Sequence, residues 1–390
     1  MCLVRGAKLC ETEEMAALKD TDDSPDGFVT LDNYADPTPP NRGALRRMAE
    51  DVWQRIRPER KQRLKLYDEL WEISGEIRDK VAMPPACGPL VDDLDRFLAP
   101  FLADQSPKEP TRLIVYPPGN DAAFIREWAE GRSLRILNAP TREQGFGPLS
   151  KAMLGEAESG TVVIPELQHW FLREVGSLEA VRDLLVRVCG SDNRVVLGCD
   201  SWAWQFLIKA VDAHHLLPEA AVVQSFSVDR LEKWMLGMVH NAGIDKSVRF
   251  RSARDGSDIF DANSEYFTEL RLESLGIPWV AWTIWRSSLF TTEKRGLSDA
   301  IWVRHPVTPD PPDTDERESL LILHALLIHG GLHPQDLRTV LPIVGNVTVL
   351  AMLQRIGLVE MRGERLQVTA KAYPTVKSAL EDDGYPGDGL

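Results

Sequence analysis

Strand-like runs and helical segments alternate along the middle of the chain. Runs of consecutive apolar, β-prone residues occur at 112–116, 133–137, 161–164, 194–198 and 221–223. Segments with helical spacing separate them, at 121–130, 147–158 and 178–189. Strands that are apolar on both faces and alternate with helices are typical of a parallel sheet covered on both sides. The pattern predicts an α/β domain over residues 108–227.

The pattern changes after this domain. Helical spacing at 229–242 and 264–289, with no strand-like run nearby, predicts a helical segment over 228–298. The proline-rich stretch that begins at Pro306 predicts a linker over 299–315. Residues 316–385 then show helical spacing at 318–328, 334–341 and 347–356, followed by two short strands around Gly363. Three helices and a hairpin predict a winged-helix domain.

The first hundred residues divide by charge. Residues 1–45 carry nine acidic against four basic residues and few large apolar ones, which predicts a flexible acidic arm. Between Arg42 and Lys65 the balance reverses, to nine basic against three acidic residues. Helical spacing in this stretch and over 66–81 predicts an N-terminal helical segment, residues 46–107.

The composition narrows the class of protein. Of the 390 residues, 43% are hydrophobic and 27% are charged, which excludes wholesale disorder, fibrous repeats and a membrane bundle. The net charge of −14 argues against a surface coated in basic charge for generic nucleic-acid binding. The five cysteines form no CxxC pair, and no apolar run approaches the ~20 residues that span a bilayer. We expect a cytoplasmic protein with reduced thiols.

The junction after the first strand-like run resembles a phosphate-binding loop. A strand, a Gly-containing turn and a helix start occur together there, and the helix start offers free N–H groups to an anion. A working loop also needs a second Gly, a Lys for the phosphates and a hydroxyl for magnesium. When the sequence 117–119 (PPG) is aligned on such loops, these positions fall on Asp121, Ala122 and Ala123. The Lys and the hydroxyl are therefore missing.

Two later strand ends carry acidic residues. Pro165 and Glu166 follow the run that ends at 164, and Asp200 and Ser201 follow the run that ends at 198. In ATP-hydrolysing sheets the first of these strands ends in an Asp that holds magnesium, with a Glu that activates water. Pro165 replaces that Asp, Glu166 keeps the Glu position, and Asp200 or Ser201 can orient a water. Glu166 and Asp200 are the candidate catalytic residues.

With these motifs the chain resembles the AAA+ and STAND-like P-loop ATPases over about residues 108–290, and a winged helix follows in some branches of that superfamily. The sequence 276–281 (GIPWVA) is similar to the Gly-Asn-Pro-Arg-x-Ala signature of the third lid helix. The resemblance implies that residues 228–298 form a helical lid. It also implies that the residue at position 279 contacts the nucleotide phosphates, and Trp279 stands there in place of Arg.

The resemblance implies an α/β, P-loop NTPase-like parallel sheet with a helical lid and a C-terminal winged helix, whose Walker A and other motifs are degenerate. We interpret the chain as a pseudo-ATPase, a regulatory or scaffolding protein without a cofactor. The alternative is a nucleotide-binding ATPase or switch that holds ATP and magnesium through backbone N–H groups, with Arg126, Arg142 or Arg173 as counter-charge. The degenerate nucleotide site comprises Pro118, Gly119, Asn120, Asp121, Ala122, Ala123 and Trp279.

Aromatic residues, a cysteine and histidines offer further candidates. Trp170, Phe171, Trp202 and Trp204 follow adjacent strand ends, where α/β domains bind ligands or partners, and they form either a partner-binding edge or core. Cys199 is either a nucleophile or a small buried hydrophobic residue. Neither His214–His215 nor the group formed by His324, His329 and His333 matches a zinc-binding spacing, so no metal site is expected.

Partners follow from less specific features. The recognition helix expected at 346–355 has one basic residue, Arg355, and the wing mixes Arg362 and Arg365 with Glu360 and Glu364, which favours a protein partner. DNA binding, through the winged helix or the basic helix 42–65, is the other alternative; that helix also suits an acidic protein or anionic lipid. The partner belongs to membrane-associated, defence or transposition machinery in the settings we considered. An oligomer would use Arg173 or Arg187 as its arginine finger.

Overall fold

The computed structural model describes residues 27–34, 70–83, 87–104, 107–120, 123–140, 160–191, 193–244, 248–262, 264–293, 299–311, 317–342 and 347–390. These residues divide into two compact units. One unit contains the described parts of 26–35, 87–224 and 308–390, and the other contains those of 36–86 and 225–307. The two units are described in turn.

A six-stranded, mostly parallel sheet lies at the centre of the first unit. Its strands, in spatial order, are β1 (Phe28–Thr30), β7 (Ala220–Val223), β3 (Thr111–Tyr116), β6 (Arg194–Asp200), β5 (Thr161–Ile164) and β4 (Arg135–Ile136). The five strands from β7 to β4 pair in parallel, and β1 adds to β7 in the antiparallel direction. The first strand of the α/β pattern thus lies between the last two. The predicted P-loop NTPase-like parallel sheet is confirmed.

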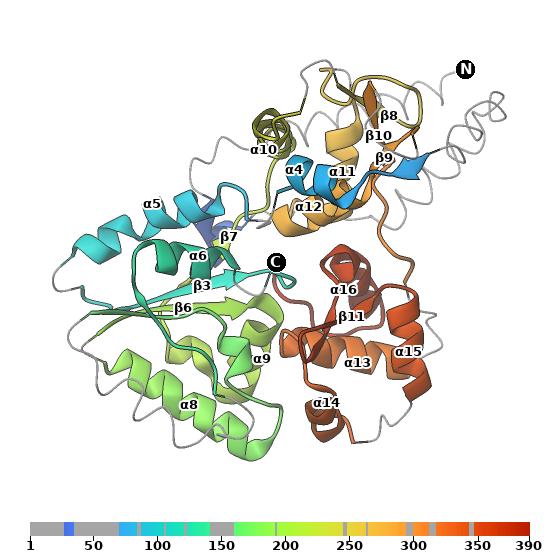
Figure 1. Ribbon diagram of the computed structural model, residues 1–390. Helices are drawn as coiled ribbons and strands as arrows, with labels where there is room; N and C mark the ends of the chain where they lie inside the picture. The colour runs from blue at the N-terminus through green and yellow to red at the C-terminus, as the bar shows by residue number, and fades with distance from the viewer. Residues whose placement is uncertain are drawn as a thin grey trace, which may run out of the picture. The chain divides into compact units, whose positions relative to one another are not determined.

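Helices cover both faces of this sheet (Figure 1). They are α5 (Leu90–Ala103) and α6 (Ala123–Gly131) on one face, and α8 (Val175–Cys189) and α9 (Ser201–Val211) on the other. The strands form because their runs are apolar on both sides, so alternate residues enter opposite cores. Leu113, Val162 and Leu197, for example, lie in the core cluster that α8 and α9 complete.

The winged helix belongs to the same unit. Its elements are α13 (Arg317–Ile328), α14 (Pro334–Val340), α15 (Val347–Arg355), β11 (Val359–Arg362), β12 (Arg365–Val368) and α16 (Tyr373–Asp382). The two strands form the predicted hairpin, with Gly363 at its turn in the left-handed region (φ 58°). The predicted winged-helix domain is confirmed, and α16 is an additional helix. α13 packs against both α9 and β12, so it contacts the α/β part and the hairpin.

The second unit is not purely helical. Its helices are α4 (Gly75–Val81), α10 (Val228–Asn241), α11 (Tyr266–Ser274) and α12 (Pro278–Ser287). A four-stranded sheet accompanies them, in the order β2 (Trp71–Glu72), β9 (Leu289–Thr291), β10 (Ala300–Val303) and β8 (Arg249–Ser252). The prediction that strands stop after residue 223 is wrong, because these strands are too short to show a clear period.

Several segment predictions need correction. The expected helix 264–289 breaks at Leu275 and Gly276, which both adopt positive φ. The expected linker 299–315 contains β10, whose Ile301 is fully buried. Within the expected helix 66–81, Trp71 and Glu72 form a strand, and the helix begins at Gly75.

Part of the predicted acidic arm is a strand. Phe28 is 3% exposed, and its ring lies 5.4 Å from that of Phe97 on α5, which explains why β1 adds to the sheet. The rest of the arm, the basic helix 42–65 and the expected helix 147–158 lie outside the described residues, apart from β1 and its neighbours up to residue 34. No helix among the described residues is both long and apolar enough to span a membrane.

Candidate functional site

The loop after β3 forms the turn that the sequence predicts. Pro118 and Gly119 leave the strand, and the backbone N–H of Ala123, at the start of α6, donates to the carbonyl of Asn120 at 3.0 Å. Gly119 has a φ of 98°, a conformation that L-residues rarely adopt, so glycine is required here. Asn120 is 6% exposed. Asp121 and Ala122, and the counter-charge candidate Arg142, lie outside the described residues.

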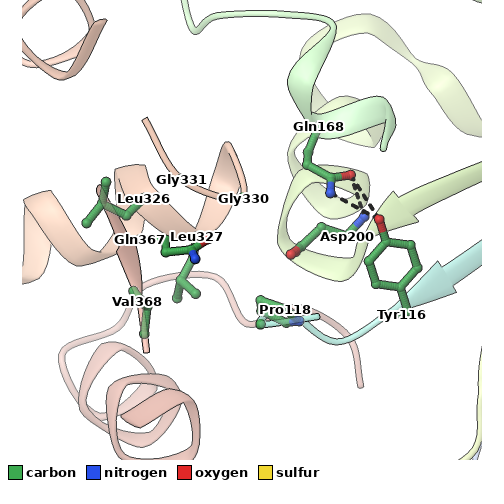
Figure 2. Close-up of a pocket in the computed structure, with 11 residues that line it drawn as sticks. Tyr116, Pro118, Gln168, Asp200, Leu326, Leu327, Gly330, Gly331, Gln367 and Val368 are labelled. Atoms are coloured by element: carbon green, nitrogen blue, oxygen red, sulfur yellow. Dashed lines mark hydrogen bonds between the residues drawn. The ribbon is translucent and has the colours of Figure 1, made fainter. Parts of the chain in front are cut away.

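A buried hydrogen-bond chain joins the three strand ends next to this loop. The hydroxyl of Tyr116 donates to the Pro165 carbonyl at 2.9 Å, and Gln168 Nε2 donates to that hydroxyl at 3.0 Å. The backbone N–H of Asp200 donates to Gln168 Oε1 at 3.1 Å, as Figure 2 shows. Burial raises the pKa of Tyr116 well above its usual value, which keeps the hydroxyl able to donate. Each of these groups serves another part of the chain.

Close packing at Gly198 holds the same strand ends together. A Cβ on Gly198 would lie 2.2 Å from the Pro165 carbonyl oxygen and 2.6 Å from Ile125. Only glycine fits at this contact. Pro165, at the position of the Walker-B Asp, therefore packs its carbonyl over β6 and accepts from Tyr116. It offers no carboxylate for a metal.

The carboxylate of Glu166 is paired within the chain. Arg126, on α6, donates from Nη2 to Glu166 Oε2 and from Nη1 to Asn138 Oδ1, the latter at 2.8 Å. Nδ1 of His169 lies 3.6 Å from the other Glu166 oxygen. The Glu166 side chain is 10% exposed and that of Arg126 is 31% exposed. Arg126 thus neutralises Glu166, and we correct its assignment as counter-charge for a phosphate.

Asp200 caps a helix. It is 2% exposed, and its Oδ1 accepts from the backbone N–H of Trp202 at 2.9 Å, so it is the N-cap of α9. An N-cap side chain satisfies one of the backbone N–H groups that a helix start leaves without a partner. Ser201, which is fully buried, donates instead to the carboxylate of Asp388 at 2.8 Å. Neither residue faces an open site for water.

The winged helix lies directly over these strand ends. Gly330 and Gly331, in the turn after α13, line a pocket together with Pro118 and Gly119. A Cβ on Gly330 would lie 2.8 Å from Cγ of Gln168. Figure 2 shows Gly330 and Gly331 on one side of this pocket, and Tyr116, Gln168 and Asp200 on the other. The pocket has about 340 Å³ of empty space, part of it open to solvent, at the lower end of the ~300–1,000 Å³ of ligand pockets.

The aromatic edge is core and not an exposed partner surface. Trp170, Phe171, Trp202 and Trp204 are each less than 5% exposed. Residues of the winged helix cover them: the ring of His329 lies 5.1 Å from Phe171, and Nε1 of Trp202 donates to the Tyr373 hydroxyl at 3.3 Å. Of the two readings of this edge, the structure supports core, between the sheet and the winged helix.

Cationic and titratable groups at this contact are adapted to burial. Nη2 of Arg173 donates to the Val340 carbonyl at 3.5 Å, and burial lowers the pKa of Arg173. Burial, reinforced by Arg173, lowers the pKa of His329 to about 3 and that of His324 to about 4. Both imidazoles are therefore neutral at pH 7. Arg173 contacts this chain's own winged helix, so its assignment as phosphate counter-charge is not supported.

The remaining candidates take structural positions. Burial raises the pKa of the Cys199 thiol well above its usual value, so Cys199 is a buried hydrophobic residue and not an activated nucleophile. Trp279, in the other unit, is 1% exposed and belongs to that unit's core. Potential ligand atoms of Asp212, His214 and His215 lie within 4.8 Å of one another at an exposed turn. These are surface contacts at 3.6 and 4.0 Å between imidazole and carboxylate.

Two kinds of residue escape the sequence patterns. Gln168, which joins three strand ends, follows Glu166 by two residues in a segment without regular period, so only its position after a buried strand was a signal. Asp388 and the glycines at 330 and 331 reach the site from the far end of the chain. What the assembled groups can do chemically is limited, because each acid is already paired or capping.

Comparisons with known proteins give only weak likenesses. No family model matches the chain, and no curated protein matches it. Among solved structures, the Aeropyrum pernix ORC2 protein with ADPNP and ADP is 13% identical, with a TM-score of 0.41, over 80% of this chain and 99% of that one. The Aeropyrum pernix ORC1 protein in complex with DNA is 14% identical (TM-score 0.38, 79% and 97% covered). Thermotoga maritima RuvB is 12% identical (0.35, 75% and 94%). Since these TM-scores lie below 0.5, we base no argument on the likenesses.

Proposed function

We propose that this protein is a catalytically inactive, AAA+-like ATPase that acts as a regulatory or scaffolding subunit through protein contacts. The observation that carries the proposal is the occupation of the nucleotide edge by the chain itself. Glu166 is paired with Arg126, Asp200 caps α9, and the turn at Gly330 and Gly331 lies against the phosphate-loop residues. Each group that would meet a nucleotide already has a partner within the chain.

Missing charge supports the same proposal. Phosphoryl transfer is catalysed by positioning and by cations that stabilise the transferred phosphoryl group. The aligned loop has Ala122 in place of the Lys, and Pro165 replaces the magnesium-binding Asp. Arg126, a nearby cation on the following helix, is already paired with Glu166. A bound triphosphate would therefore find little counter-charge at this edge.

The winged helix supports a protein partner over DNA. Of its side chains that the structure describes, α15 exposes Thr348, Ala351, Gln354 and Arg355, of which one is basic. The hairpin exposes Met361, which is 48% exposed, beside charges of both signs. Groove-reading helices use several cationic or amide side chains, and phosphate contacts need a basic surround. A mixed surface with an exposed methionine suits protein contact better.

A phosphate-release assay with ATP and magnesium tests the proposal, using the wild-type chain and Glu166→Gln in parallel. We expect the same background rate from both, because Glu166 serves an ion pair. Turnover in the wild type that Glu166→Gln abolishes would overturn inactivity and establish the alternative of an atypical ATPase. Retardation of duplex DNA at low salt, lost in Arg355→Ala, would favour a DNA-binding regulator over a protein-binding one.

A further inference from the structure

Residues after α16 turn back and dock on the α/β part of the same unit. Gly384, with a φ of 81°, ends the helix, and the backbone N–H of Tyr385 donates to the Leu380 carbonyl at 2.9 Å. The chain then brings Asp388 to 1% exposure and Leu390 to 7% exposure. Leu390 belongs to the core cluster that the sheet forms with α8 and α9. This segment is buried like a core strand although it has no regular structure.

Asp388 is the centre of the docked segment. Its Oδ2 accepts from Ser201 Oγ at 2.8 Å and from the Tyr373 hydroxyl. Its Oδ1 accepts from Lys377 Nζ at 2.8 Å and from the backbone N–H of Leu390 at 3.2 Å. Ser201 begins α9 of the α/β part, whereas Tyr373 and Lys377 lie on α16 of the winged helix. One carboxylate therefore joins the two parts.

Charge and packing make this junction specific. The side chain of Lys377 is 9% exposed and that of Asp388 is fully buried, so each ion depends on the other for compensation. Breaking a buried ion pair by removing one partner leaves a charge that water cannot reach. Lys377 also donates to the Leu390 carbonyl, which links the ion pair to the insertion of Leu390 into the core. The glycine at 389, at φ 76°, lies where a Cβ would meet Gln205 Nε2 at 2.5 Å.

We infer that residues 386–390 form a clasp that holds the winged helix over the carboxyl edge of the sheet and that its release uncovers that edge. The clasp is fixed by Asp388 at one point and by Leu390 at another, and the edge it closes includes Gln168 and the turn at Gly330. The inference rests on the proposed function for its role, since a regulatory subunit needs a device that exposes or hides a surface.

Hydrogen exchange measured by mass spectrometry on the full chain tests the clasp. In Asp388→Ala we expect peptides covering 165–173 and 326–332 to exchange at least tenfold faster, while peptides from the centre of β3 stay unchanged. The matched control is Asp382→Ala, an exposed acid on α16, and it should leave all peptides unchanged. Unchanged rates in Asp388→Ala, or a uniform increase over the whole unit, would overturn the inference.

A reversible variant covers the case in which Asp388→Ala does not fold. Ser201→Cys with Asp388→Cys places two thiols where the two side chains now hydrogen bond. We expect the oxidised form to exchange at least tenfold more slowly at 165–173 and 326–332 than the reduced form. Equal rates in the two forms would overturn the clasp. Nucleotide turnover is read in a separate assay, so failure of the proposed function and failure of the clasp are distinguishable.

Discussion

Arg126 and Glu166 form an ion pair that joins α6 to the end of β5. The pair consumes both the candidate catalytic carboxylate and a nearby cation that could have met a phosphate. Its two residues are 40 positions apart in the sequence, so only the fold brings them together. The pair explains why an acid kept at the catalytic position need not have a catalytic role.

Removing one member of this pair should destabilise the protein. We expect Glu166→Gln or Arg126→Met to lower the free energy of unfolding by about 1–3 kcal/mol, below the ~3–5 kcal/mol of fully buried pairs because Arg126 is partly exposed. The double variant should cost less than the sum of the two single ones, with a coupling of at least about 1 kcal/mol. Urea unfolding of the four proteins measures this.

The matched control is the exposed pair of Glu76 and Lys80 on α4, whose atoms lie 3.0 Å apart. Glu76→Gln should change the free energy of unfolding by less than about 0.5 kcal/mol. Additive effects of the Arg126 and Glu166 substitutions would show that the two side chains do not interact in solution.

Asp200 should behave as a helix cap. Asp200→Ala removes the acceptor of the Trp202 N–H and should lower the free energy of unfolding by about 1 kcal/mol. Asp200→Asn keeps an oxygen that can accept this bond and should cost less, because Asn is also a favourable N-cap residue. Thermal unfolding of the two variants compares them. If Asn destabilised the protein as much as Ala, the negative charge and not the cap would be the important property.

Acid should weaken the fold through His329. Burial, with Arg173, lowers its pKa to about 3, whereas the unfolded chain protonates its histidines near 6.5. As the pH falls from 6.5 towards 3, the unfolded state binds a proton that the folded state excludes. Stability should therefore decrease by up to about 1.4 kcal/mol per pH unit from this residue, and the contribution is flat above pH 6.5.

His329→Leu tests this slope. Urea unfolding at pH 4, 5, 6 and 7 should give a pH dependence shallower than that of the wild type by about 1.4 kcal/mol per pH unit below pH 6. His333→Leu is the control, because His333 is only half-buried, at the start of α14. Parallel stability curves for the wild type and His329→Leu would mean that His329 is accessible to protons in the folded protein.

The sequence predicts the first unit well because its strands are long apolar runs. β3, β5 and β6 each follow such a run, and the order of helices and strands sets the parallel sheet and the winged helix. It also places Glu166 and Asp200 at one edge, since both follow parallel strands. The strands β9 and β10 escape prediction because three or four residues show no period.

The roles of the site residues depend on contacts that no local pattern contains. Glu166 looks catalytic until α6 brings Arg126 to it, and Ser201 looks like a water-orienting residue until Asp388 arrives from 187 residues away. The aromatic edge at Trp170 and Trp202 reads equally as surface or core, and the winged helix decides for core. Sequence spacing thus locates the edge, and long-range packing determines its chemistry.

Calorimetric titration of the full chain with ATP and magnesium tests the central claim, that the chain itself occupies the nucleotide edge. We predict no saturable heat at ATP concentrations up to several millimolar, and no rise of the melting temperature under the same conditions, because a ligand that does not bind the folded state cannot stabilise it. Micromolar binding with one site per chain, weakened by substitution of Asn120 or Gly119, would contradict the account.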